Sequence, residues 1–241
     1  MAQTLPLVLL IAFLSTFARS SVGFGDALIA MPLLTILLGI QTATPLVGLM
    51  AAAMSAMILL QSWRDVEIGD AWRLVLASFV GMPGGIWLIR VAPEEFVSGG
   101  LGLLLIAFGL YALLRPALPQ LSNTRWVYFF GGLAGALGAA YNTNGPPVVV
   151  YGALRHWSPA RFRATLQGFF LPSGFAISLS HAVGGLWNRQ VFVLFAFCLI
   201  PMIAAVAAGY WLNRRIPGER FSRLLYAIVA GLGLLLLIRS I

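Results

Sequence analysis

Eight long apolar runs, separated by short segments that hold most of the arginines, constrain this chain more than any other feature. Of its 241 residues, 60% are apolar and 9% are charged, and the mean hydropathy is +0.94. A soluble domain of this size has too little interior for so much apolar surface. About 20 helical residues, in contrast, span a hydrocarbon core about 30 Å thick. The sequence therefore predicts an all-α polytopic membrane protein.

Two of the runs are too long for one span and contain helix-breaking residues. Residues 5–38 include two glycines and Pro32, and residues 126–154 include Pro146 and Pro147. We expect each of these to be a broken or re-entrant helix. The other six runs have ordinary spanning length or slightly less: 46–60, 72–89, 97–114, 166–183, 191–212 and 224–238. The first run lacks the features of a removable signal peptide, so we expect it to be the first membrane element.

The two halves of the chain resemble each other. An offset of 124 residues gives twelve identical positions between residues 85 and 115. The identical pairs include Trp87 with Trp211, Arg90 with Arg214, Pro93 with Pro217, and Glu95 with Glu219. Shared hydrophobicity does not explain such pairs, so we interpret them as an internal duplication. Residues 1–115 form the first transmembrane repeat, 116–124 the linker and 125–241 the second repeat, each with one broken or re-entrant helix plus three spanning helices.

The distribution of arginines predicts how the two repeats are oriented. If both broken runs enter the membrane and return, eleven arginines share one side, and only Arg90, Arg189 and Arg239 lie on the other. If every run crosses once, the two sides hold six and eight arginines. The positive-inside rule favours the first arrangement. Each half then crosses an odd number of times, so we expect inverted repeats with both termini facing outward.

The two breaks predict a polar site that they share. Backbone groups freed by a broken helix cannot face lipid, so they must face protein or a water-filled cavity. The exposed N-terminus of a half-helix offers unpaired N–H groups and the positive end of the helix dipole. We therefore expect a central cavity that favours a small anion.

Arg19 and Asp26 are ionisable residues beside the first break. The planar guanidinium of Arg19 is suited to holding two oxygens of an oxyanion, and its alternative role is to reach the membrane surface. Asp26 is a candidate for the carboxylate that couples transport to a proton or cation. Its alternative roles are to cap the second half-helix or to pair with Arg19.

Polar residues near both breaks complete the predicted site. Asn142 and Asn144 either cap the returning half-helix or present amide donors to a substrate, and Pro146 and Pro147 fit its first turn. Gln167 either contacts the substrate or ties helices together. The predicted substrate contacts are Arg19, Ser20, Ser21, Gly23, Gly25, Asn142, Thr143, Asn144, Gly145 and Gln167, and the predicted helix breakers are Pro32, Pro146 and Pro147.

The remaining chemistry-bearing residues favour structural roles. His181 has no second histidine or carboxylate at metal-ligand spacing, and the single cysteine, Cys198, cannot form an intrachain disulfide. We expect no metal and no cofactor. The basic residues lie in short connections rather than in one patch, which excludes nucleic-acid binding, and no nucleotide-binding signature is present.

Two segments resemble the sulfite exporter TauE/SafE family, also known as the four-toluene sulfonate uptake permease family. They are residues 23–32 (Gly-Phe-Gly-Asp-Ala-Leu-Ile-Ala-Met-Pro) and 144–151 (Asn-Gly-Pro-Pro-Val-Val-Val-Tyr). The duplication and the length agree as well, although Asp26 stands where many relatives carry glycine. The resemblance implies a transporter of sulfite, organosulfonates or related sulfur-containing anions in the bacterial inner membrane.

Three classes of function are consistent with the residues. A secondary transporter that works by alternating access around a midplane site explains the duplication, both breaks and the buried polar residues. A passive anion channel would explain the cavity equally well. An intramembrane enzyme would need a nucleophile with a base, or a metal set, and the sequence contains neither a His-Glu-x-x-His motif nor paired intramembrane aspartates. We therefore expect a transporter rather than an enzyme. Its expected partners are a small anionic substrate and the lipid bilayer.

Overall fold

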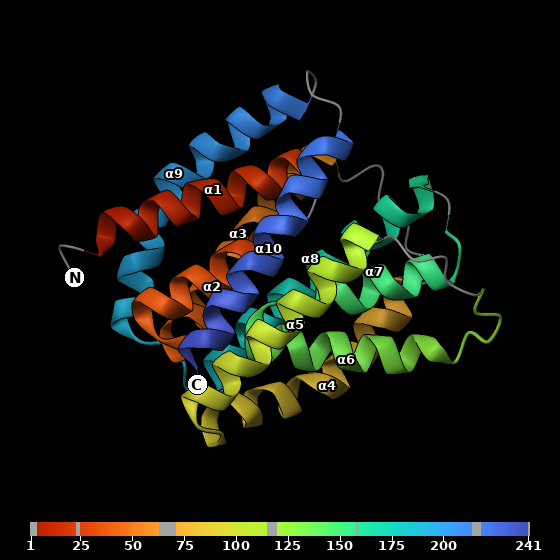
Figure 1. Cartoon of the computed structure of the whole chain (residues 1–241), viewed down its shortest axis with the longest axis horizontal. Coiled ribbons are helices and arrows are strands. Elements are labelled where there is room, and N and C mark those ends of the chain that lie inside the picture. The colour runs from red at the N-terminus through yellow and green to blue at the C-terminus, as the bar shows by residue number, and fades with distance from the viewer. Residues whose placement is uncertain are drawn as a thin grey trace.

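The computed structural model describes residues 4–22, 25–62, 71–114, 120–157, 159–213 and 218–240, and every regular element in these ranges is an α-helix (Figure 1). The helices are α1 Leu5–Val22, α2 Asp26–Leu38, α3 Ile40–Ser62, α4 Ala71–Val91, α5 Glu94–Leu114, α6 Trp126–Tyr141, α7 Gly145–Leu154, α8 Pro159–Val183, α9 Arg189–Asn213 and α10 Gly218–Arg239. Among these described helices, four contain apolar segments long enough to cross a membrane: Ile40–Met57, Ala71–Val91, Glu94–Leu114 and Arg189–Gly209.

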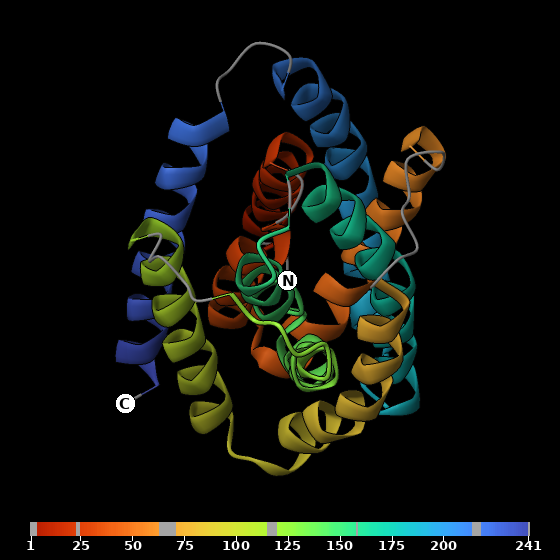
Figure 2. The ribbon, with the colours of Figure 1, turned by 90° about the vertical axis from the view of Figure 1, so that its right-hand side faces the viewer.

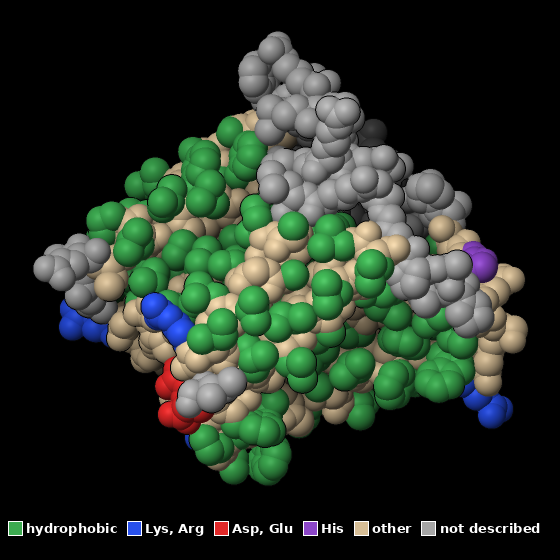
Figure 3. Space-filling model, viewed as in Figure 1, with side chains coloured by type: hydrophobic (Ala, Val, Ile, Leu, Met, Phe, Trp, Pro, Cys, Tyr) green, Lys and Arg blue, Asp and Glu red, His purple; other side chains and the backbone are tan. Residues whose placement is uncertain are grey.

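The surface fits a hydrocarbon environment. Apolar side chains cover most of the face shown in Figure 3, and the charged side chains visible there lie toward its left and right ends. Large apolar residues such as Leu103 on α5 and Ile203 on α9 are exposed. Outward apolar faces of this extent are typical of lipid contact. The chain is a multi-pass membrane protein, which confirms the all-α, membrane-spanning prediction.

Both long runs are broken where the sequence predicts. In the first run, α1 ends at Val22 and α2 begins at Asp26, directly after Gly25, whose φ of 102° is strained for any residue with a side chain. The fifth run divides into α6 and α7 at Asn142, which adopts a left-handed conformation with φ 53°. Asparagine tolerates this conformation better than most residues. Pro146 and Pro147 lie in the first turn of α7, as expected.

Pro32 does not break a helix, contrary to our expectation. It is buried inside α2, which continues to Leu38 and ends at Gly39. A proline within a helix removes one backbone hydrogen bond, but neighbouring helices in a membrane bundle tolerate this loss. The break is set instead by the glycine at position 25, where the backbone changes direction.

Helices α6 and α7 form a hairpin. The backbone N–H of Leu121, which precedes α6, donates to the carbonyl of Leu154 at the end of α7 over 2.7 Å. Arg155 Nη1 donates to the carbonyls of Leu121 and Ser122 at 2.7 and 3.1 Å. The end of α7 therefore lies beside the chain that enters α6, so the pair returns to the side from which it started.

Helices α1 and α2 follow a similar course. In Figure 1, α1 leads away from the N-terminus at the left, and α2 packs against it. The chain after α2 lies beside the start of α5, where Glu94 Oε1 accepts a hydrogen bond from the backbone N–H of Ile40 at 2.8 Å. The C-terminus lies toward this same left side of Figure 1.

The helices of the two halves pack in matching pairs. Helix α4 packs along α6, and its counterpart α9 packs along α1; α3 packs against α8, and α5 against α10 (Figure 2). Helices α5 and α10 approach closely at Gly102 and Gly233, since a Cβ atom at either would lie 2.7 Å from the other's carbonyl oxygen. These two glycines therefore serve helix packing, as is typical of membrane bundles.

Candidate functional site

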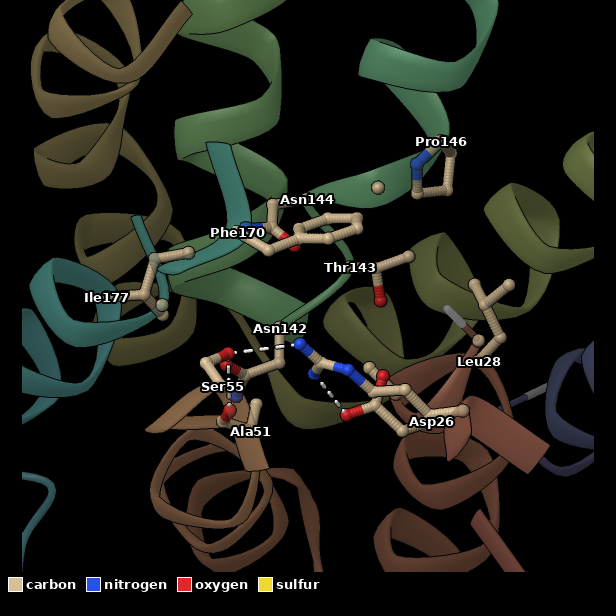
Figure 4. A pocket seen from close by; sticks show the side chains of 15 residues that line it. Asp26, Leu28, Ala51, Ser55, Asn142, Thr143, Asn144, Pro146, Phe170 and Ile177 are labelled. Carbon is tan, nitrogen blue, oxygen red and sulfur yellow. Dashed lines mark hydrogen bonds and ion pairs between the residues drawn. The ribbon is translucent and has the colours of Figure 1, made fainter. Parts of the chain in front are cut away.

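A small cavity lies between the two helix breaks (Figure 4). Its volume of about 40 Å³ is roughly three times what one water molecule needs, so it suits a compact group of a few heavy atoms. It is lined by Arg19 of α1, residues 25–28 at the start of α2, Ala51 and Ser55 of α3, residues 142–146 of the second break, and Phe170, Gly174 and Ile177 of α8. Both halves of the chain therefore contribute to its walls.

Arg19 points into the protein and not toward the membrane surface. Its side chain is 5% exposed, and its Nη1 lies 2.8 Å from Asp26 Oδ2. Its Nη2 donates to Ser55 Oγ at 3.0 Å, and the guanidinium carbon lies 5.6 Å from the centre of the Phe170 ring. Its buried Nε has no hydrogen-bond partner among the described residues. The interpretation of Arg19 as a surface anchor is therefore wrong, because its guanidinium is held inside the protein by Asp26 and Ser55.

Asp26 pairs with Arg19 and does not cap α2. The N-cap position belongs to Gly25, and no described side chain gives α2 a capping hydrogen bond. Asp26 is the first helical residue, where a negative charge is favourable for the helix dipole. The nearby guanidinium attracts its carboxylate more strongly than a backbone N–H would. Of the structural roles we considered for Asp26, pairing with Arg19 is the one observed.

The first turns of α2 and α7 both border the cavity. No described side chain caps α7 either, although Asn144 occupies its N-cap position. The N–H groups of a first turn have no partner within the helix. Residues 26–28 of α2 carry three such groups, whereas Pro146 and Pro147 remove two from α7. The first half therefore supplies more of the backbone donors.

The polar residues of the second break line the cavity but hold neighbouring helices. Asn142 Nδ2 donates to the carbonyl of Thr44 on α3, and Asn144 Nδ2 donates to Ser173 Oγ on α8 at 3.1 Å. Thr143 Oγ1 donates to the carbonyl of Tyr141 at 2.9 Å. Neither asparagine caps α7, because each amide is hydrogen-bonded to another helix instead. Each amide therefore uses one of its two N–H donors to hold a neighbouring helix.

Of the remaining predicted contacts, one turns away from the cavity and three fall on positions that the structure does not describe. Ser20 Oγ donates to the carbonyl of Val206 on α9 at 3.1 Å and faces away from the site. Gly23 lies outside the described residues, and so do the side chains of Ser21 and Gln167. Pro32 lies further along α2 and does not line the cavity.

The sequence reasoning missed Ser55, Phe170 and Gly174. Each lies in a long apolar helix, where small or aromatic residues favour packing. Nothing in their local sequence marks them as site residues. A Cβ atom on Gly174 would lie 3.8 Å from Ser55 Oγ, so α3 and α8 face each other at these positions.

His181 packs against the second break from outside the cavity. It is fully buried, and its Nε2 donates to the carbonyl of Ala139 at 2.8 Å. This contact agrees with the interface role expected for it. Among the described residues, no group of three or more His, Cys, Asp or Glu side chains is placed to hold a metal ion.

The fold and the cavity define a class of protein: a multi-pass membrane protein with a buried arginine and two half-helix N-termini around one small space. The family model for the sulfite exporter TauE/SafE matches residues 8–236, nearly the whole chain, and the chain belongs to this family. It is therefore a membrane transporter of the sulfite-exporter type. Searches of the curated proteins and of the solved structures each found no match.

Proposed function

We propose that the chain is a secondary transporter, acting as an exporter, of small sulfur-containing anions such as sulfite or organosulfonates across the bacterial inner membrane. The observation that carries this proposal is the convergence of Arg19 and the N-termini of α2 and α7 on one cavity. A guanidinium and two positive dipole ends stabilise an anion where lipid would otherwise exclude it. The site lies between the two halves, as in other carriers with broken helices.

The transport mechanism we propose is alternating access between inverted repeats, residues 1–115 and 125–241. Two observations support it. The α4–α6 and α9–α1 packing pairs are related by exchanging the halves, and the hydrogen bonds of Arg155 bring α7 back toward the start of α6. A returning hairpin is the condition under which eleven arginines share one side. That side faces the cytoplasm, and both termini face outward.

Asp26 is the proposed coupling group. Its carboxylate neutralises Arg19 in a cavity wall, so an incoming anion competes with Asp26 for the guanidinium. Protonation of Asp26 neutralises this competing carboxylate. When an anion with one negative charge then binds to Arg19, the net charge of the site is the same as before. One proton would then move with each singly charged anion.

The test is counterflow in proteoliposomes loaded with unlabelled sulfite or a small sulfonate, with labelled anion outside. We expect saturable uptake that Arg19→Gln/Asp26→Asn abolishes, because this double variant removes the guanidinium without leaving a buried unpaired carboxylate. Arg189→Gln, at an exposed position at the start of α9, is the matched control. Flux without counterflow would indicate a channel, and no flux of any sulfur oxyanion through folded protein would contradict the proposed substrate class.

A further inference from the structure

A second, wider groove lies on the lipid-facing surface, separate from the central cavity. It has a volume of about 860 Å³ and runs between α4 and α8, which lie side by side at the lower right of Figure 2. Its walls include Phe79, Met82 and Ile86 of α4 and Ala176, Leu179 and Val183 of α8. Such a volume is within the range of specific ligand sites, about 300–1,000 Å³. Apart from Ser180 and a residue at one end, the side chains that line the groove are apolar.

One end of the groove carries a cation at the level of the membrane surface. Arg90 lies in the last turn of α4, is exposed, and forms no ion pair with any described residue. Trp87, one turn earlier, is 64% exposed and also lines the groove. Exposed tryptophans of membrane helices lie at the headgroup level. The guanidinium of Arg90 is therefore placed where lipid phosphates lie, and its planar donors match a phosphate.

The length of the groove corresponds to one leaflet. Between Phe79 and Arg90, α4 rises about 16 Å at 1.5 Å per residue, and half of a hydrocarbon core is about 15 Å thick. An apolar channel of this length with a cation at its interfacial end matches a phospholipid in both shape and charge. A free phosphate would leave the apolar walls uncovered.

We propose that the α4–α8 groove binds one anionic phospholipid, with its phosphate on Arg90 and an acyl chain along the groove. The lipid belongs to the leaflet on the side of both chain termini. It would contact α8 at Ala176, directly beside Ile177, which lines the central cavity. Helices α4 and α8 come from different halves of the chain, so the lipid would lie at an interface between the two halves.

The test is photolabelling of the delipidated protein with phosphatidylglycerol that carries a diazirine on its acyl chain, followed by peptide mapping. We expect labels in residues 79–91 and 176–184. Arg90→Gln should reduce labelling about fivefold, the value of one basic residue near anionic headgroups. Ala176→Trp should block labelling by filling the groove.

Two matched variants serve as controls. Arg189→Gln removes an exposed arginine outside the groove, and Leu103→Trp adds bulk to an exposed position on α5; neither should change labelling. Size-exclusion profiles establish that all four variants are folded. Labels spread evenly over exposed helices, equal labelling with Arg90→Gln, displacement of the lipid by inorganic phosphate, or cross-links that join two copies across the groove would each overturn the proposal.

Discussion

The two helix breaks share an architecture but differ in chemistry. The α1–α2 break is bordered by the Arg19–Asp26 ion pair, whereas the α6–α7 break holds neutral amides followed by two prolines. Among the described residues that line the cavity, both charged side chains come from the first half. A half-helix N-terminus from each half borders the cavity, whereas the charged side chains among these lining residues come from one half.

The two breaks are also held in place differently. Gly25 has no side chain, and the first break is bridged by the Arg19–Asp26 ion pair. Asn142 is tied to α3 and Asn144 to α8 by their own amides. Under the proposed function, a bound anion or a proton would open the first break, whereas the second break would form a fixed wall.

Arg19→Ala should give the largest effect and tests this asymmetry directly. Removing a charged donor costs about 1.5–3 kcal/mol, up to roughly 100-fold in anion affinity. Asn144→Ala, its matched variant in the second break, removes a neutral hydrogen bond of about 1 kcal/mol and should weaken affinity by at most roughly fivefold. The half-saturation of counterflow measures both. Equal losses at the two positions would contradict the division between the breaks.

Asp26→Asn should separate binding from coupling. The variant carries a permanently neutral group at this position, so it should bind the anion but lose the response to a proton gradient. Initial rates with and without an imposed proton gradient measure this. A variant that keeps the wild-type response to the gradient would exclude Asp26 as the coupling group.

Gly25→Ala should lower stability by an intermediate amount. A residue with a side chain pays about 1–2 kcal/mol in the left-handed region, and the new Cβ atom would lie 3.2 Å from Leu225 Cδ2. We expect the melting temperature to fall by roughly 3–8 °C. Scanning fluorimetry in detergent measures the shift, with Gly174→Ala as the control because it lies inside the regular helix α8. Unchanged stability would show that the first break is not rigid.

Gly174→Ala should have the smallest effect on stability and a selective effect on transport. Its Cβ atom would make an ordinary contact with Ser55 Oγ at 3.8 Å, and alanine is favoured over glycine in a helix by up to about 1 kcal/mol. The added methyl group narrows a small cavity, so uptake of a bulkier organosulfonate should fall more than that of sulfite. Competition assays with both anions test this, and equal losses would argue against a size limit at this wall.

Local features of the sequence predicted the positions of both breaks. Gly25 and the Asn-Gly-Pro-Pro segment disfavour a continuous helix through the local conformation of their own backbone. The positions of the breaks can therefore be predicted without knowing which helices are neighbours. The positive-inside bias also favoured returning hairpins, and the hydrogen bonds between Leu121, Leu154 and Arg155 agree with that expectation for α6 and α7. Pro32 shows the limit of this reasoning, since a buried helix tolerates one missing hydrogen bond.

The lining of the cavity was predicted less completely. Ser20 and Arg19 are adjacent in sequence but about 100° apart around a helix, so one faces α9 and the other faces the cavity. Ser55 and Phe170 meet Arg19 only because α3 packs against α2 and α8 packs against α3. A single sequence does not show which helix faces contact each other. Within their own segments, Ser55 and Phe170 resemble ordinary packing residues.

By itself, the sequence determined that this chain crosses a membrane and where its two long runs break, because hydropathy, glycine and proline act within one segment. The tertiary structure decided that Arg19 is turned inward onto Asp26 and Ser55, that the asparagines hold α3 and α8, and that a groove remains between α4 and α8. These outcomes depend on which helix faces become buried together. That choice is a property of the packed bundle, in which every buried polar group must find a partner on another helix.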